Sequence, residues 1–144
     1  MYSIRPMTMD DLPDVATLLV VTSGVVLRDA DTPEGMRRYL QRNPEYSFDA
    51  EVADRIVGCA MSGHDGRRGY LNHVCVTPEQ RSRGIAAALV EQCLGALARN
   101  GITKVHLDVL ENNANAKVYW PKRGWQHRLD IQRFSMTLSG GENA

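Results

Sequence analysis

Cysteine is scarce in this sequence, and no two cysteines stand at metal-binding spacing. The three that occur, Cys59, Cys75 and Cys93, include no C-x-x-C pair, and their number is odd. A disulfide framework and a cysteine zinc site are therefore disfavoured, and no metal is expected. Each cysteine lies in an apolar segment, which predicts buried, reduced thiols in a protein of the cytoplasm.

An excess of one charge and a long hydrophobic run are also missing. Seventeen basic side chains balance seventeen acidic ones, which argues against a dedicated nucleic-acid binder and a disordered polyelectrolyte. The longest stretch without charge, Val15–Leu27, is shorter than the ~20 residues that span a bilayer. The first residues lack the basic and then apolar pattern of a targeting segment. We expect a soluble, cytoplasmic protein with no nucleic-acid or membrane partner.

The length and the apolar content suffice for one domain of ordinary size. The chain has 144 residues, of which 43% are hydrophobic, so a core can form without a metal or a disulfide. We predict a single domain over residues 1–144, in which the polar residues 139–144 form a loose tail.

Periodicity and capping signals predict the helices. Two early helices open after Thr8 and Thr32, where a capping residue is followed by acids or by proline, and they end near Gly24 and Asn43. A longer helix over 84–100 is predicted by an apolar residue at every fourth position, namely Ile85, Leu89, Cys93 and Leu97. A last helix is predicted over 112–123.

Alternating apolar residues and turn signals predict the strands. The expected strands are 2–5, 46–53, 56–62, 70–76, 103–110, 126–129 and 132–138. The order is β-α-α-β-β-β-α-β-α-β-β. It indicates an α+β fold with one mixed, mostly antiparallel sheet of about six or seven strands and about four helices.

Two arginines and a glycine separate the strand at 70–76 from the long helix. The first backbone N–H groups of a helix lack partners and carry part of a positive charge, which suits a phosphate. Gly84 allows close approach of the backbone, and Arg81 and Arg83 can add charged hydrogen bonds. The alternative is an ordinary solvated basic loop. The pattern is neither of the glycine-rich nucleotide motifs.

The segment Arg81–Ala86 matches [QR]-x-x-G-x-[GA], and it follows the phrase Val74–Pro78. Downstream, Asn113–Ala116 and then Gly124-Trp125 match N-x-x-A-x-x-x-Y-x-x-x-G-[FW] in part. With these motifs the chain resembles the GNAT superfamily of N-acetyltransferases over essentially its whole length. The stretch 63–69 resembles a bacterial branch, the YpeA-like acetyltransferases.

The resemblance implies acetyl-CoA as the acetyl donor. In the family, the strand before the motif splays from its neighbour and pairs with the pantetheine arm, while the motif amides hold the pyrophosphate. The residues implied in binding the donor are Val74, Val76, Arg81, Ser82, Arg83, Gly84, Ile85, Ala86, Asn113 and Trp120. Asn113 is alternatively a helix cap, and Trp120 is alternatively a core aromatic.

Acetyl transfer to an amine requires a base, because an ammonium has no lone pair. Asp108 falls where some N-terminal acetyltransferases of the family carry a glutamate, and His73 is a second candidate. The alternative for each is a structural strand residue. Tyr119 is a candidate acid, although the family's tyrosine position holds Trp120, which cannot donate a proton in water.

Three functions follow as hypotheses. The first is an N-acetyltransferase in which a primary amine attacks directly in a ternary complex. The second is a sensor that binds acetyl-CoA with little turnover, which the missing tyrosine favours. The third is a small nucleotide-binding protein. The acceptor, a small-molecule or peptide amine, is not identified, although Asp29, Asp31 and Glu34 outweigh Arg28 near its expected site. Monomer and homodimer both remain open.

Overall fold

The computed structural model describes residues 1–22 and 26–144, in two compact units that are treated separately. The first unit, Met1–Leu107, contains eight regular elements. In chain order they are β1 (Ser3–Pro6), α1 (Leu12–Val21), α2 (Pro33–Arg42), β2 (Phe48–Val52), β3 (Arg55–His64), β4 (Gly69–Val76), α3 (Ile85–Arg99) and β5 (Val105–His106). The second unit, Asp108–Ala144, contains α4 (Ala114–Lys122).

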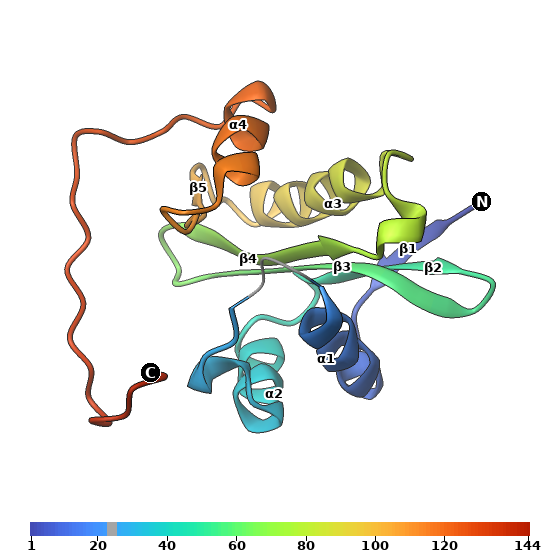
Figure 1. The fold of residues 1–144 in the computed structure, drawn as a ribbon, viewed down its shortest axis with the longest axis horizontal. Helices are drawn as coiled ribbons and strands as arrows, with labels where there is room; N and C mark the ends of the chain where they lie inside the picture. Colours follow the sequence, from blue (N-terminus) through green and yellow to red (C-terminus); the bar gives the residue numbers. More distant parts are fainter. Residues whose placement is uncertain (23–25) are drawn as a thin grey trace. The chain divides into compact units, whose positions relative to one another are not determined.

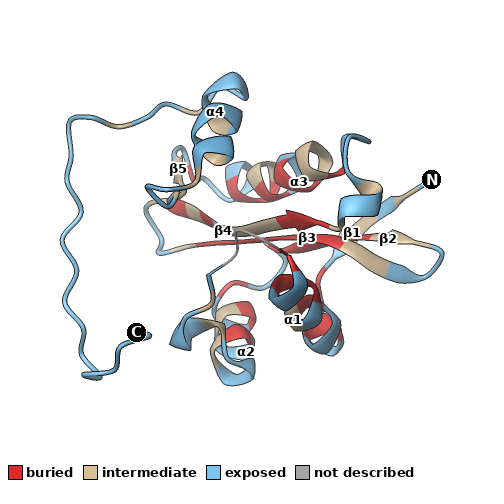
Figure 2. Cartoon of the chain, viewed as in Figure 1, coloured by how far each residue is buried: buried red, intermediate tan, exposed pale blue. Residues whose placement is uncertain are grey.

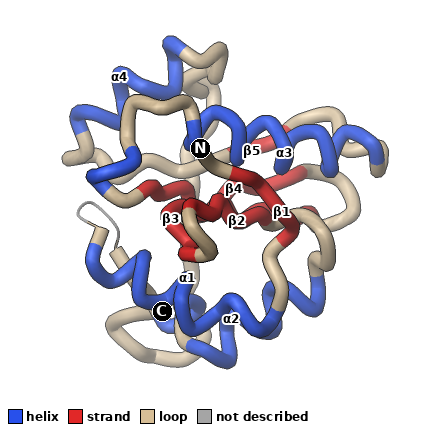
Figure 3. Tube along the Cα trace, turned by 90° about the vertical axis from the view of Figure 1, so that its right-hand side faces the viewer, coloured by secondary structure: helices blue, strands red, loops and turns tan. Residues whose placement is uncertain are grey.

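The strands of the first unit form one sheet in the order β1-β2-β3-β4-β5. Neighbours from β1 to β4 are antiparallel, and β4 and β5 are parallel. Helix α3 covers one face of the sheet, and α1 and α2 cover the other (Figures 1 and 3). This is the mixed sheet with helices on it that the element order predicted.

Helix α3 packs on the sheet through the apolar stripe that the sequence predicted. Ile85, Leu89, Cys93 and Leu97 are all buried. Figure 2 shows the buried residues along the centre of the sheet and on the helix sides that face it. The helix ends at Arg99, close to the predicted end at 100, and Gly101 just beyond it takes a left-handed φ of 84°.

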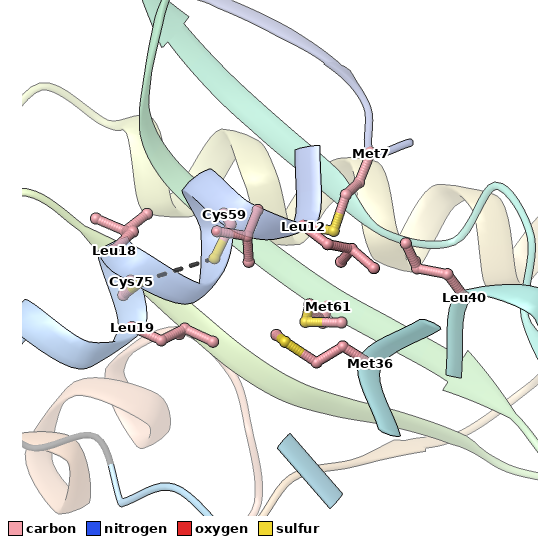
Figure 4. Close-up of a cluster of buried hydrophobic side chains, with 10 residues drawn as sticks. Met7, Leu12, Leu18, Leu19, Met36, Leu40, Cys59, Met61 and Cys75 are labelled. Atoms are coloured by element: carbon pink, nitrogen blue, oxygen red, sulfur yellow. Dashed lines mark hydrogen bonds between the residues drawn. The ribbon is translucent and has the colours of Figure 1, made fainter. Parts of the chain in front are cut away.

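The opposite face carries a second apolar cluster, between the sheet and the first two helices (Figure 4). Its buried members are Met7, Leu12, Val15, Leu18, Leu19, Met36, Leu40, Cys59, Met61 and Cys75. Cys59 and Cys75 are paired across β3 and β4, with their sulfurs 3.6 Å apart. All three cysteines are free and buried, as predicted.

Local capping fixes the ends of the early helices. The Thr32 side chain accepts a hydrogen bond from the Gly35 N–H at 3.1 Å, so α2 begins where its capping signal predicted. Helix α2 ends at Arg42, before Asn43. Helix α1 ends at Val21. Gly24, which was expected to end it, lies outside the described residues.

One arginine joins the first strand to three carboxyl groups. Arg5 binds Asp11 at 2.7 Å and Glu51 at 3.0 Å, and lies 3.8 Å from Asp49. Asp49 is fully buried, and burial together with the neighbouring Asp11 raises its pKa to about 8. Asp11 has a pKa well below its usual range because it is bonded to Arg5. Asp49 is therefore mostly protonated at neutral pH, so it does not add a second buried negative charge to that of Asp11.

The C-terminal strands were predicted wrongly. No strand occurs within 126–138, which the structure describes in full and which Figure 1 draws as a plain trace. Its apolar side chains are exposed, with Leu129 at 85% and Phe134 at 89%. A strand exists only with a partner that takes its hydrogen bonds, and this segment pairs with none in the structure. The sheet therefore has five strands rather than six or seven.

The strand expected at 103–110 is much shorter than its alternation suggested. Only Val105 and His106 pair with β4, opposite Gly69 and Tyr70. Strand β5 ends at His106, and no described residue after it pairs with β4, although the apolar alternation continues to Val109. Among the described residues, no helix is long and apolar enough to cross a membrane.

Candidate active site

Strand β4 is paired along its whole length on one edge and only at its start on the other. It pairs with β3 from Gly69 to Val76. It pairs with β5 only at Gly69 and Tyr70. The backbone of β4 from Leu71 to Val76 therefore leaves one edge of the sheet without a strand partner in the described unit. Such an edge can pair with an extended ligand.

A bulge interrupts the paired edge of β4 near its middle. Met61 is opposite His73 and Ser62 is opposite Leu71, so Asn72 has no opposing residue. A bulge bends a strand and re-aims its side chains and amides, and bulges are frequent next to active sites. The exposed Asn72 and the half-buried His73 stand at this bend.

The open edge leads into the loop that carries the two arginines. Thr77 is held by a hydrogen bond from its N–H to the Val57 carbonyl at 2.8 Å, and a 3-10 turn, Pro78–Gln80, follows. The Arg81 side chain turns back, and its Nε donates to the Val76 carbonyl at 3.0 Å. Arg83 is exposed. Both arginines are exposed, but only the Arg81 side chain is tied to β4 by a hydrogen bond.

The loop ends in a strained backbone at the start of α3. Ser82 and Gly84 both take left-handed conformations, with φ of 64° and 80°. The N–H groups in the first turn of a helix have no acceptor within the helix. No side chain caps α3 to supply one. A Cβ placed on Gly84 meets no atom within 4 Å. The residues present therefore fit an anionic group, because unpaired amides, the helix dipole and open space coincide there.

The predicted donor-binding valines lie on β4 beside the open edge. Val74 is half-buried and pairs with Ala60, and Val76 is buried and pairs with Gly58. Both side chains are at least partly buried, while the backbone of their strand has no partner from β5 at these positions. The structure thus brings Val74, Val76 and the loop 81–86 together in one continuous stretch of the first unit.

His73 forms a short hydrogen bond with the segment between α1 and α2. Its Nε2 lies 2.7 Å from Oδ1 of Asp31, which belongs to the 3-10 turn Asp29–Asp31. The two side chains keep only 17% and 15% of their surface exposed. Asp31 had been noted only as one of several acids near the acceptor site, and the partner of His73 was not predicted.

A second bond joins the neighbouring residue of β4 to α2. The Asn72 amide donates to the Tyr39 hydroxyl at 2.6 Å. Burial raises the pKa of Tyr39 above its usual range, so this phenol stays protonated. The sequence did not predict the contact between Tyr39 and Asn72, because it joins positions 33 residues apart.

The remaining predicted residues belong to the second unit. Asn113 caps α4 with its side chain, which accepts from the Ala116 N–H at 3.1 Å. The cap that was one of its two alternatives is therefore present. Trp120 packs edge-on against Trp125, with ring centroids 5.4 Å apart. The structure places these residues on or beside α4, and their relation to the donor loop stays a prediction.

The two candidate catalytic groups of the second unit have polar partners. Asp108 follows β5 rather than lying in it; its side chain is 72% exposed and forms an ion pair with Arg133 at 3.2 Å. The Tyr119 hydroxyl accepts from Arg123 Nε at 3.3 Å, and the Arg123 guanidinium lies over its ring. The catalytic roles of Asp108 and Tyr119 stay predictions.

Comparison with known proteins gives both relatives and structural neighbours. A sequence profile described as the acetyltransferase (GNAT) family matches residues 12–125. An acetyltransferase of Pectobacterium atrosepticum is 39% identical over 111 residues, which cover 76% of this chain and 77% of that protein.

Two solved structures with similar folds hold different bisubstrate analogues. An AAC(6')-Iy complex with CoA-S-monomethyl-acetylneamine has a TM-score of 0.74 and 19% identity, covering 95% of this chain and 99% of that chain. Arabidopsis thaliana Naa50 with CoA-Ac-MVNAL has a TM-score of 0.71 and 20% identity, covering 96% and 92%. These likenesses bear out the fold expected from the sequence. The profile match and the identity to a bacterial acetyltransferase show that the chain belongs to the GNAT family of acetyltransferases.

Proposed function

We propose that this protein is an acetyl-CoA-dependent N-acetyltransferase that acts on a primary amine. The observation that carries the proposal is the continuity of the open β4 edge with the uncapped start of α3. An extended amide-containing chain can add to the edge while its phosphates reach the helix N-terminus. Membership of an acetyltransferase family supports the acetyl group as the one transferred.

The residues proposed to hold the donor follow that path. Backbone groups of Val74 and Val76 pair with the pantetheine arm, and the amides from Arg81 to Ala86 receive the pyrophosphate. Arg83, exposed beside these amides, adds charge-assisted hydrogen bonds. Asn113 and Trp120 are the proposed contacts from the second unit. When bound, acetyl-CoA supplies an activated thioester carbonyl.

The protein's own groups then serve the acceptor amine. A base must take its proton, and His73 is proposed for this role because it stands at the β4 bulge. Asp108 is the second proposed base. Backbone N–H groups on the open edge can donate to the charge that develops on the acyl oxygen. The amine attacks directly in a ternary complex.

Departure of the thiolate does not require a side-chain acid in this proposal. A free thiol has a pKa of about 8.5, so a thiolate is a tolerable leaving group near neutral pH. Trp120 cannot act as an acid in water. Tyr119 lies one residue before the family's tyrosine position, which makes it a weak candidate.

The acceptor is proposed only by class. One structural neighbour was solved with an aminoglycoside-type bisubstrate analogue and another with a peptide-type analogue. We therefore propose a small-molecule or peptide amine.

Ligand binding and turnover together test the proposal. Acetyl-CoA at about 100 times its Kd should stabilise the protein by ~2.7 kcal/mol, measured as a rise in Tm, and ATP should not. Thiol release with a panel of amines, including a polyamine, an aminoglycoside and a peptide N-terminus, should identify the acceptor by mass change. Binding without turnover on any amine would instead support a sensor. No shift with acetyl-CoA or CoA would overturn the donor site.

The two candidates in the second unit give a sharper kinetic prediction. Asp108→Asn keeps the size but removes a base, so kcat should fall by one to two orders of magnitude if Asp108 takes the proton, about 1.4–2.7 kcal/mol of barrier. Tyr119→Phe should change kcat by less than about threefold, or about 0.7 kcal/mol. The measurement is steady-state thiol release. An unchanged kcat in Asp108→Asn would exclude Asp108 and leave His73 as the candidate base. A large fall of kcat in Tyr119→Phe would identify Tyr119 as the acid.

A further inference from the structure

The hydrogen bond between His73 and Asp31 has a defined direction. An ionised carboxylate only accepts hydrogen bonds, and a neutral imidazole has one N–H. The 2.7 Å distance joins Nε2 of His73 to Oδ1 of Asp31. Whenever the ring is neutral, its proton must therefore be on Nε2, which leaves the lone pair on Nδ1. Among the described residues, Nδ1 has no hydrogen-bond partner.

Asp31 is itself held in place on its other oxygen. The backbone N–H of Arg28 donates to Oδ2 of Asp31 at 2.8 Å, while Oδ1 faces the histidine. The Asp31 N–H in turn donates to the Arg28 carbonyl at 2.9 Å. Both carboxylate oxygens are thus engaged, and the side chain cannot rotate without losing one of the two bonds.

The turn that carries Asp31 is packed against the start of α2. Thr32, the next residue, caps that helix through the Gly35 N–H. Gly35 also lies so close to the Ala30 backbone that a Cβ at this position would overlap the Ala30 carbonyl. Helix α2 therefore fixes the turn, the turn fixes Asp31, and Asp31 fixes the ring of His73.

We propose that Asp31 is a positioning residue for His73, which it holds in the tautomer whose Nδ1 accepts the proton of the acceptor amine. The inference rests on the proposed N-acetyltransferase function. In the proton transfer, Nδ1 takes one proton from the amine as its nitrogen bonds to the acyl carbon and the carbonyl π electrons move to oxygen. When the carbonyl re-forms, the C–S bond breaks and the thiol group leaves as a thiolate with the electron pair of that bond. The imidazolium that has formed is stabilised by the adjacent carboxylate. The low exposure of both side chains strengthens this stabilisation, because little water screens it.

The neighbouring acid of the same turn provides a matched control. Asp29 is exposed and belongs to the same 3-10 turn, but it is not the residue paired with His73. Asp29→Asn removes the same charge from the same turn as Asp31→Asn does. A general effect of acidic charge on a cationic acceptor would appear in both variants, while a positioning effect would appear only in Asp31→Asn.

The first experiment reads the tautomer in the free protein and needs no turnover. Long-range proton–nitrogen NMR spectra of the neutral imidazoles distinguish Nε2–H from Nδ1–H, and His73→Gln identifies the signals of His73. We expect the Nε2–H form in the wild type and in Asp29→Asn. Asp31→Ala, which retains no acceptor for that proton, should give a mixture of the two tautomers. An Nδ1–H wild type, or an unchanged tautomer in Asp31→Ala, overturns the inference.

The second experiment measures acetyl transfer with the acceptor found above. Asp31→Asn should lower kcat at least tenfold while the KM for acetyl-CoA stays within about twofold, and Asp29→Asn should leave kcat within about twofold. Equal kcat in Asp31→Asn and the wild type overturns the inference alone. A wild type that binds acetyl-CoA but acetylates no amine overturns the proposed function, whatever the tautomer. Because Asp31→Asn can lower stability, Tm is measured for each variant, and kcat is compared well below the lowest Tm.

Discussion

The first unit contains two turns that are similar in residue composition but differ in whether their backbone N–H groups have acceptors. The hairpin turn between β3 and β4 has Gly66, Arg67 and Arg68, and the loop before α3 has Arg81, Arg83 and Gly84. Both glycines have left-handed φ angles, 93° and 80°, and a Cβ on either meets nothing within 4 Å. By their arginines and their left-handed glycines the two turns are alike, although the loop before α3 has a second left-handed residue, Ser82.

Their backbone amides distinguish them. In the hairpin turn, one carboxylate oxygen of Asp65 accepts from the N–H groups of Arg67 and Arg68, each at 2.8 Å. The loop before α3 has no such acid, and no side chain caps the helix. A turn whose donors are satisfied internally is structural, whereas unpaired donors at a helix start can receive an anion. The difference teaches that the missing acceptor, rather than arginine or glycine, marks the candidate site.

The largest expected difference between the two turns comes from valine at their glycines. Gly84→Val and Gly66→Val both force a branched residue into a left-handed conformation, which costs about 1–2 kcal/mol of stability in each. Only Gly84→Val should also abolish the stabilisation by acetyl-CoA. The measurement is Tm with and without ligand for both variants. If acetyl-CoA raised the Tm of Gly84→Val as much as that of the wild type, the loop before α3 would not be the donor site.

A smaller difference is expected from the arginines. Arg83→Ala should weaken acetyl-CoA binding by about 1–3 kcal/mol, roughly 5- to 140-fold in Kd, because a charged hydrogen bond to phosphate is lost. Arg67→Ala, with the same change of charge in the other turn, should leave Kd nearly unchanged. Calorimetric titration at two salt concentrations measures both, and the loss in Arg83→Ala should shrink as salt rises. Equal losses in both variants would indicate long-range attraction instead of contact.

The smallest expected effect concerns pH and the hairpin turn alone. The N–H groups of Arg68 and Arg67 lower the pKa of Asp65. A carboxyl whose pKa is lower in the folded state stabilises the fold above its unfolded pKa of about 3.9, and this contribution disappears as pH falls through the folded value. Asp65→Asn should therefore lower the Tm at pH 7, and the difference from wild type should narrow at pH 3. Acetyl-CoA affinity at pH 7 should not change in this variant.

Much of the first unit could be predicted from local sequence signals. The stripe from Ile85 to Leu97 and the cap at Thr32 depend on residues a few positions apart, and both occur as predicted. The loop before α3 was also located, since its strand, glycine and helix adjoin one another. Short-range patterns succeed where the physical cause is short-range.

The failures all depend on partners distant in sequence. The alternation of apolar and polar residues at 103–110 and 126–138 is compatible with a strand. It does not show whether a neighbouring strand is available to pair with it. The pairing of His73 with Asp31 joins positions 42 apart, and the bulge at Asn72 arises from the register between two strands. No single segment contains the information for these features, although they shape the candidate active site.

The half-paired strand β4 also bears on solubility. A sheet edge with unpaired backbone groups is a template for another polypeptide, and natural proteins cover such edges to avoid aggregation. Between Leu71 and Val76 none of the described residues pairs with that edge. If acetyl-CoA binds there as proposed, it would cover the edge and protect the protein against strand-to-strand association. The ligand-free protein should then aggregate more readily than the ligand-bound protein.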